Sequence, residues 1–299
     1  MNKEYRALTK PYIVTDGGRF KLKDHNPRGP GKAAARHRTK KFLKKGVQAL
    51  SALQETLYAQ DRWGILLIFQ AMDAAGKDGA IKHVLSGVDP KGCQVVSFKA
   101  PSSEELDHDF MWRTSKALPE RGRIGIFNRS YYEETLIVRV HPEILQRQKL
   151  PAELVTKRIW QERFADINAF ERYVTRNGFI VRKFFLNLSR AEQRRRFLAR
   201  LERPEKNWKF EMGDISERAQ WTKYMAAYEE AIRRTATPHA PWVVIPSDDK
   251  KFARTVIAAA IIDAMSSLRL HFPTLDAEQK RDLGRARRLL NQETRRAKP

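Results

Sequence analysis

Short apolar runs alternate with longer amphipathic or charged stretches over most of this chain. The runs contain few polar residues, and they cover residues 64–70, 93–98, 123–128, 178–188 and 241–247. Continuous apolar runs of this length are typical of strands that are buried on both faces. Amphipathic segments such as 151–177 and 214–235 lie between them. Strands that alternate with helices predict a parallel sheet with helices on both faces, a three-layer α/β fold.

The chain before the first run divides into two parts. Residues 1–35 are rich in Gly, Pro, Lys and Arg and lack apolar periodicity, which predicts an extended basic arm. From about His37 to Gln60, apolar side chains fall near helical spacing and predict a leading amphipathic helix. The domain organisation that follows is an arm at 1–35, a main domain at 36–270 and a basic C-terminal tail at 271–299.

The charge changes this picture by pointing to a partner. The chain has 299 residues and a formal net charge of +23, with 58 Lys and Arg against 35 Asp and Glu. Such a surplus favours a polyanion: nucleic acid, an anionic membrane or a phosphate polymer. Residues 1–50 hold 14 basic and 3 acidic side chains, and residues 190–209 hold 8 and 3. The alternative is a solvated basic surface with a loose arm.

Other compositional features are plain. No apolar run has the length of a membrane span, and the N-terminus lacks the pattern of a secretory signal. The single cysteine, Cys93, excludes an internal disulfide framework and a multi-cysteine zinc site. These features predict a cytoplasmic protein that does not associate with a membrane.

The stretch QAMDAAGKDGAIKHV, which begins at the end of the first apolar run, resembles a Walker A phosphate loop altered in two places. Ala71 replaces its first glycine, and Asp78 replaces the Ser or Thr that normally holds magnesium. Small residues let backbone N–H groups converge on an anion, and the start of the next helix adds a favourable dipole. The alternative is an ordinary strand-to-helix turn. The predicted phosphate contacts are Ala74, Ala75, Gly76, Lys77, Asp78, Gly79 and Lys82.

Asp73, in the middle of this loop, needs an explanation because a bound phosphate would repel it. A carboxylate beside phosphates is tolerable when a cation lies between them, so Asp73 is a candidate magnesium ligand. It is also a candidate for orienting the attacking phosphate oxygen, since phosphoryl transfer depends mainly on positioning and charge compensation. The alternative is an aspartate that only caps a helix or forms a turn.

The segment IGIFNRSYYEETLIVRVHPE begins within the third apolar run and continues beyond it. Many phosphate-loop enzymes have a metal-binding Asp at the position of Asn128. Arg129 offers a planar fork for a phosphate, and Glu133 is a candidate for the ligand role that Asn128 fills poorly. The predicted metal ligands are therefore Asp73, Asn128 and Glu133. A structural ion pair is the alternative for Arg129.

A basic segment, SRAEQRRRFLARLERPEKNWKF, begins with a capping pattern at Ser189. Arg196, Arg200 and Arg203 recur at spacings of four and three, which places a basic stripe on one helix face. We interpret residues of about 189–213 as a cationic lid over phosphates, and a solvated helix face is the alternative. The further predicted polyphosphate contacts are Arg113, Arg129, Arg194, Arg195, Arg196, Arg203, Lys206 and Lys209.

Together with APWVVIPSDDK, these three segments resemble the polyphosphate kinase 2 family from about Lys40 to Leu270. The resemblance implies a thymidylate-kinase-like P-loop fold that moves phosphate between inorganic polyphosphate and nucleotides with magnesium, or manganese in its place. It also implies that Asp73 is the key carboxylate and Lys77 the phosphate-binding lysine, and that Asn128 and Arg129 occupy the Walker B-like positions. The predicted catalytic residues are Asp73, Lys77, Arg129 and Glu133. A dimer or tetramer is implied as well.

The order Asn128-Arg129-Ser130-Tyr131-Tyr132-Glu133 is similar to the branch of this family that accepts both nucleoside mono- and diphosphates. The resemblance therefore implies AMP and ADP as acceptors, with guanine nucleotides as further candidates. Two other functions stay open from the sequence: an ATP-dependent nucleoside monophosphate kinase, and a basic nucleic-acid binder without sequence specificity. If the arm at 1–35 extends a polyphosphate groove, its deletion raises the Michaelis constant for long chains more than for short ones.

Overall fold

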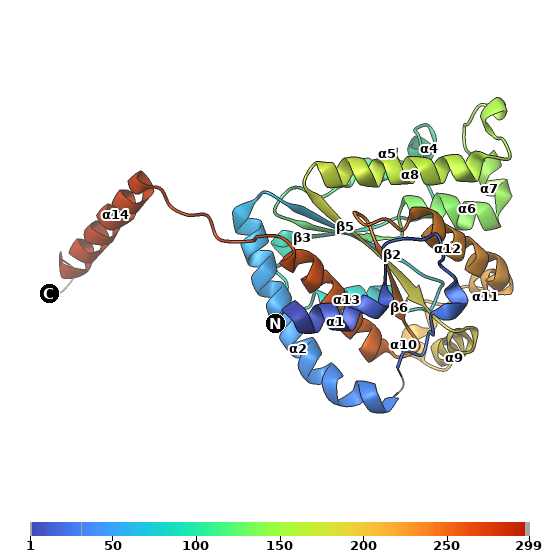
Figure 1. Ribbon diagram of the computed structural model, residues 1–299, viewed down its shortest axis with the longest axis horizontal. Helices are drawn as coiled ribbons and strands as arrows, with labels where there is room; N and C mark the ends of the chain where they lie inside the picture. Colours follow the sequence, from blue (N-terminus) through green and yellow to red (C-terminus); the bar gives the residue numbers. More distant parts are fainter. Residues whose placement is uncertain (1, 31, 297–299) are drawn as a thin grey trace.

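A six-stranded sheet forms the centre of the protein, seen nearly edge-on in the computed structural model, which describes residues 2–30 and 32–296 (Figure 1). Its strands are β1 (Ile13–Val14), β2 (Gly64–Gln70), β3 (Cys93–Ser97), β4 (Ile124–Asn128), β5 (Phe179–Asn187) and β6 (Trp242–Pro246). The order across the sheet is β1-β6-β5-β2-β4-β3. Neighbours from β3 to β6 run parallel, and β1 adds to β6 in the antiparallel direction. The five predicted strands and the parallel sheet are confirmed.

Two layers of helices cover the sheet, as the three-layer prediction requires (Figure 1). One layer packs around the apolar helix α13, and it consists of α1 (Asn2–Thr9), α2 (Lys32–Gln60), α3 (Lys77–Val84) and α13 (Lys250–Ser266). The other layer consists of the 3-10 helix η4 (Tyr131–Thr135), α6 (Ile137–Val140), α8 (Ile159–Arg176) and α12 (Trp221–Thr235). The predicted leading helix is α2, which ends at the expected Gln60 and buries Leu50 and Leu57 completely.

The prediction of an extended N-terminal arm is wrong for the residues up to Asp24. They form α1, the 3-10 helix η1 (Lys10–Tyr12), strand β1 and a further 3-10 turn, η2 (Leu22–Asp24). Tyr5 is only 3% exposed and meets Phe42 edge-on with the ring centroids 4.8 Å apart. The segment folds because its few apolar side chains cover α13 and because the backbone of β1 pairs with the edge strand β6. Neither contact requires a periodic pattern of apolar residues in the sequence. The division of the chain at residues 35 and 270 stays a prediction.

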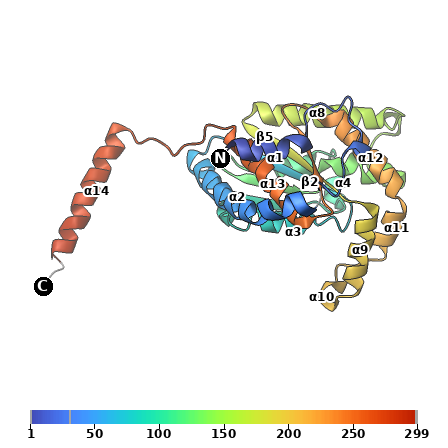
Figure 2. The same ribbon diagram turned by 60° about the horizontal axis from the view of Figure 1, so that its bottom comes forward.

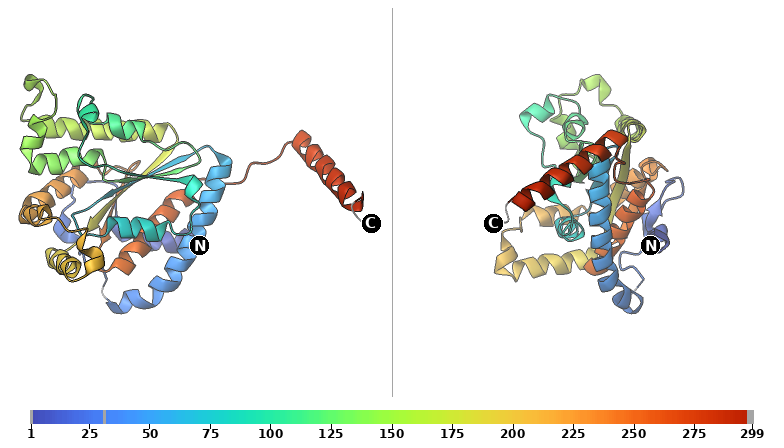
Figure 3. Two further views of the ribbon diagram at one scale, coloured as in Figure 1. Left: turned by 180° about the vertical axis from the view of Figure 1, so that it is seen from behind. Right: turned by 90° about the vertical axis from the view of Figure 1, so that its left-hand side faces the viewer.

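Two parts extend from this body. The segment predicted as the lid, about 189–213, contains α9 (Arg190–Leu201) and α10 (Pro204–Asn207), which project from the carboxyl ends of the strands (Figure 2), and α11 (Gly213–Ala219) begins at its end. The C-terminal helix α14 (Ala277–Arg296) lies apart from the body at the end of a linker, as Figure 1 and the left view of Figure 3 show. The remaining short elements are α4 (Ser103–Leu106), α5 (Trp112–Lys116), α7 (Pro142–Gln146), η3 (Pro90–Gly92) and η5 (Ala152–Leu154). Within the described residues, no helix is both long and apolar enough to cross a membrane.

The N-terminal segment should contribute directly to stability. We expect Tyr5→Ala to lower the free energy of unfolding by about 3 kcal/mol, because it leaves a cavity beside Phe42. Lys3→Ala, at an exposed position of the same helix, should change it by less than about 0.5 kcal/mol. Urea denaturation followed by circular dichroism measures both. Equal stability of the two variants would show that the segment is not packed in solution.

Candidate active site

The carboxyl ends of three neighbouring strands bring the candidate residues to one edge of the sheet. β2 leads into the altered phosphate loop, β4 ends at Asn128, and β5 leads into α9 of the lid. The backbone N–H of Arg129 donates to the carbonyl of Phe69 at 3.0 Å, which ties the second segment to the start of the loop. In open parallel sheets this edge is where ligands bind.

The loop itself is held in a strained shape by α9. Ala74 adopts φ of +62° and Gly76 φ of +95°, and a left-handed conformation costs a residue with a side chain of the order of 1–3 kcal/mol. Arg196 offsets this cost by donating from Nη1 to the carbonyls of Ala74 (3.1 Å) and Ala75 (2.7 Å). Gln193 donates to the carbonyl of Asp73 at 3.0 Å. The base of the lid therefore shapes the phosphate loop.

Arg129 lies between two carboxylates. Its guanidinium nitrogens are 3.3 Å from Asp73 Oδ1 and 3.8 Å from Glu133 Oε2. Burial, and then the charge of Arg129, lower the pKa of Lys77, against the opposing effect of the nearby carboxylates. Burial raises the pKa of Glu133, although Arg129 and Lys77 counteract it. These four predicted catalytic side chains thus form one coupled group of charges.

Asn128, one of the predicted metal ligands, makes two side-chain hydrogen bonds. Its amide Nδ2 donates to Asp78 Oδ1 at 2.7 Å and to Ser97 Oγ at 3.3 Å. The amide that replaces a Walker B acid thus contacts the acid that replaces a Walker A hydroxyl. This contact exists because an amide donates a proton that a carboxylate at the same position would lack.

The oxygen ligands around the loop fit a divalent ion that also binds substrate. No cluster of three or more His, Cys, Asp or Glu side chains with metal-binding geometry occurs among the described residues. Magnesium, however, is commonly held by one or two carboxylates together with substrate phosphates and water. Asp73 and Glu133, which flank the same guanidinium, can supply those carboxylates.

Two cavities meet at Asp73. A cavity of about 320 Å³ lies between the loop and the lid. It is lined by basic side chains of α9, of the segment that follows α9, and of the start of α13. These are Arg195, Arg196, Arg200, Arg203, Lys206, Lys209 and Lys250. A second cavity, of about 600 Å³, is lined by Trp208, Tyr224, Tyr228, Leu136 and Ile137 together with charged side chains, among them Arg129, Glu133, Arg200, Lys209, Glu211, Asp214 and Glu217. Asp73 and Asp78 line both.

Most predicted site residues line one of these cavities. They are Asp73, Ala74, Ala75, Gly76, Lys77, Asp78, Gly79, Arg129, Glu133, Arg195, Arg196, Arg203, Lys206 and Lys209. Three predicted phosphate contacts do not. Lys82 and Arg194 are exposed elsewhere on their helices. Arg113 donates to the carbonyl of Lys99 at 2.8 Å and pairs with Glu105, away from the loop.

Several residues of the site were not singled out by the sequence. Gln193 and the tyrosines of α12 carry no motif, because each reaches the site through the packing of a helix that looks ordinary in sequence. Lys250 had a signal: it follows Asp249, which caps α13 at the carboxyl end of the last strand. Burial, together with Arg196 and Lys206, lowers its pKa.

The comparisons with known proteins agree with this geometry. The family model described as Polyphosphate kinase 2 matches residues 33–272. The chain belongs to the polyphosphate kinase 2 family. It is thus a polyphosphate kinase with a P-loop kinase-like α/β fold, and both predictions are confirmed. A kinase-type phosphotransferase of this kind works with a divalent metal.

Individual relatives are similar over most of their length. The ADP-polyphosphate phosphotransferase of Rhodopseudomonas palustris is 52% identical over 83% of this chain and 86% of its own length. The AMP/ADP-polyphosphate phosphotransferase of Meiothermus ruber is 40% identical over 88% and 95%. The crystal structure of Polyphosphate Kinase 2 from Arthrobacter aurescens TC1 has a TM-score of 0.82 at 39% identity, covering 90% of this chain and 94% of that one.

Arg196 and Arg194 provide a matched test of the loop geometry. We expect Arg196→Met to lower kcat by about tenfold or more, because the loop loses the bonds that hold its strained shape. Arg194→Met removes the same charge two residues away from an exposed position and should leave kcat within about twofold. Steady-state rates of both purified variants decide this. Equal losses would mean that only the charge of the helix matters.

Proposed function

We propose that this enzyme transfers the terminal phosphate of inorganic polyphosphate to AMP and to ADP, and that the reaction is reversible. The observation that carries the proposal is the position of Asp73 at the boundary of two cavities, of which only the larger has tryptophan and tyrosine in its lining. The basic cavity suits a polymer with about one negative charge per phosphate. The larger cavity, in which aromatic side chains lie beside charged ones, suits a nucleoside with its phosphates toward Arg129.

The geometry supports an in-line transfer. An oxygen of the nucleotide's terminal phosphate attacks the terminal phosphorus of the polymer, and the bond from that phosphorus to its bridging oxygen breaks. The shortened polymer leaves with the negative charge, which Lys77 and the basic side chains of the lid compensate. Asp73, held by Arg129, orients the acceptor from the boundary of the cavities. A phosphate oxygen is already ionised, so no strong general base is required.

We propose magnesium as the metal, with manganese as a substitute. Asp73 and Glu133 would hold it together with phosphate oxygens, and Asn128 would act indirectly by orienting Asp78. When bound, such an ion neutralises the charge that develops on the transferring phosphate. Arg129 keeps the two carboxylates at this place and compensates their repulsion. Guanine nucleotides as further acceptors, and a dimer or tetramer, are finer parts of the proposal.

Acceptance of AMP is the most specific part. It rests on the segment Asn128–Glu133, and the printed names of the two relatives differ at this point, since one names ADP alone and the other AMP and ADP. The deciding experiment supplies long-chain polyphosphate and magnesium with either AMP or ADP and no ATP. ADP and then ATP formed from AMP supports the whole proposal. Product from ADP alone limits the enzyme to diphosphates, and no product from either refutes polyphosphate as the donor.

Asp73→Asn tests the carboxylate at the boundary. We expect kcat to fall by about a hundredfold to a thousandfold, because the amide cannot hold a cation or balance Arg129. The circular dichroism spectrum should not change. Asp107→Asn, an exposed carboxylate outside both cavities, should behave as the unsubstituted protein does. Retained turnover in Asp73→Asn would remove this residue from its proposed role.

The C-terminal helix tests how a long polymer is captured. The N-terminal segment packs on the body of the protein. The basic terminal segment that lies apart from the body is therefore α14. Its exposed cations include Arg281, Arg285 and Arg288, which share one face. We expect removal of residues 273–299 to raise the Michaelis constant for long polyphosphate several-fold, with little change for short chains, because a tethered polymer gains local concentration.

The matched control for the tail keeps its charge. Leu283→Ser with Leu289→Ser changes exposed apolar positions of α14 and should leave both Michaelis constants unchanged. An equal rise for long and short polyphosphate after truncation would show that the tail acts on the fold and not on the polymer.

A further inference from the structure

An ion pair without any access to solvent lies directly beneath the segment that carries Arg129 and Glu133. Lys183 of β5 and Glu171 of α8 are both 0% exposed, and Nζ lies 2.5 Å from Oε2. Lys183 also donates to the carbonyl of Thr235 at 2.7 Å. The other carboxylate oxygen of Glu171 accepts from the hydroxyls of Tyr131 (3.0 Å) and Tyr132 (2.9 Å). The side chains of two consecutive residues of η4 thus donate hydrogen bonds to one buried carboxylate.

Stability alone does not account for this pair. Removing two charges from water costs more than their attraction often returns, and apolar replacements of similar volume are often neutral or stabilising. In this protein such a replacement would also remove the hydrogen-bond partners of the Thr235 carbonyl and of the Tyr131 and Tyr132 hydroxyls, so the pair is tied to the position of η4. We therefore look for the role of this ion pair in the positions that it imposes on the residues bonded to it.

That geometry extends into the active site within one or two residues. The rings of Tyr131 and Tyr132 are fully buried, and Tyr132 packs on Trp242 at 4.8 Å. Ser130 accepts from Gln70 at 3.2 Å and from the backbone N–H of Tyr132 at 3.1 Å. These bonds leave little freedom at residues 130–132. The positions of the two tyrosine hydroxyls therefore set the directions of the flanking side chains, Arg129 and Glu133.

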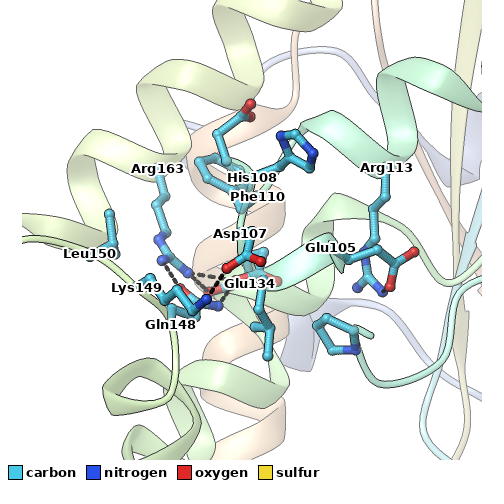
Figure 4. A pocket seen from close by; sticks show the side chains of 13 residues that line it. Glu105, Asp107, His108, Phe110, Arg113, Glu134, Gln148, Lys149, Leu150 and Arg163 are labelled. Carbon is cyan, nitrogen blue, oxygen red and sulfur yellow. Dashed lines mark hydrogen bonds and ion pairs between the residues drawn. The ribbon is translucent and has the colours of Figure 1, made fainter. Parts of the chain in front are cut away.

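A second buried ion pair fixes the far side of the same segment. Arg163 Nη1 donates to Glu134 at 2.7 Å (Oε2) and 3.2 Å (backbone carbonyl), and Gln148 donates to the same carboxylate at 2.6 Å. Figure 4 shows these side chains converging in a cavity of about 240 Å³. The adjacent acids therefore differ: Glu134 is tied into the interior, while Glu133 lines the cavity at Asp73.

We propose that Glu171 and Lys183 are positioning residues for phosphate transfer. Lys183 fixes the carboxylate of Glu171, which anchors the hydroxyls of Tyr131 and Tyr132. This anchoring holds Arg129 and Glu133 at the distances from Asp73 that the transfer requires. The inference rests on the proposed function, and it assigns the pair an effect on kcat and not on the binding of polyphosphate.

The test compares two double variants that lose the same charges. Glu171→Gln with Lys183→Met keeps an amide oxygen that can accept from the tyrosines, whereas Glu171→Leu with Lys183→Met does not. We expect the Gln variant to keep kcat within about threefold, and the Leu variant to lose about tenfold or more, with the Michaelis constant for polyphosphate nearly unchanged in both. Equal kcat per folded molecule in the two variants would overturn the proposal.

Tyr131→Phe with Tyr132→Phe provides the same comparison if the Leu variant does not fold. It retains both rings and the ion pair, so a drop in kcat of about tenfold supports the anchor, and kcat within twofold of the unsubstituted protein refutes it. Met265→Ala, a cavity variant in α13 across the sheet, controls for lost stability and should leave kcat unchanged.

Hydrogen–deuterium exchange separates this inference from the proposed function. Amides of residues 129–135 should exchange faster in the Leu and Phe variants than in the Gln variant, whether or not polyphosphate is the donor. An unsubstituted enzyme that is inactive with polyphosphate would refute the proposed function, while the exchange rates would still decide the anchor. Identical exchange in all variants would refute the anchor.

Discussion

Hydrogen bonding of β2 to parallel neighbours on both sides is the constraint from which the active site follows. Phe69, one residue before the end of β2, pairs with both Asn128 and Phe184. β4 therefore ends level with the start of the loop, whereas β5 continues for three further residues to Asn187. This extra length carries α9 past the loop, so that its first two turns lie over the loop's backbone carbonyls. Register alone thus brings together segments that lie far apart in sequence.

The arginines of this site have two distinct effects. Arg196 is mostly buried and contacts backbone carbonyls, so its charge compensates the dipoles of the loop. Arg195, one residue earlier, is largely exposed and donates to Glu192, with which Arg196 also pairs. Cations such as Arg195, Arg203 and Lys206 remain oriented toward the basic cavity. One basic stripe in a sequence therefore contains two kinds of side chain: those that hold the loop in shape, and those that place positive charge at the cavity.

The sequence predicts the parts of the fold that depend on local pattern. Buried strands and a loop after the first of them were recognisable because apolar runs and small residues act through neighbouring residues. The folding of the N-terminal segment was not, because it depends on contacts between Tyr5 and Phe42 and on a free sheet edge. Which arginine turns inward was also hidden, since Arg194 and Arg196 look alike. Lys183 did leave a signal, as a charge inside an apolar run.

The buried and exposed charges respond differently to salt. In the proposed function, exposed cations on the lid and tail would interact with a polyanion through water, where about 0.15 M salt screens charges beyond about 8 Å. The pairs Glu171–Lys183 and Glu134–Arg163 are shielded from ions by the core. Ionic strength would thus act on the proposed capture of the polymer and not on the arrangement of Arg129 and Glu133. Such a separation allows a strongly basic surface to vary its affinity for polyphosphate without disturbing the geometry of transfer.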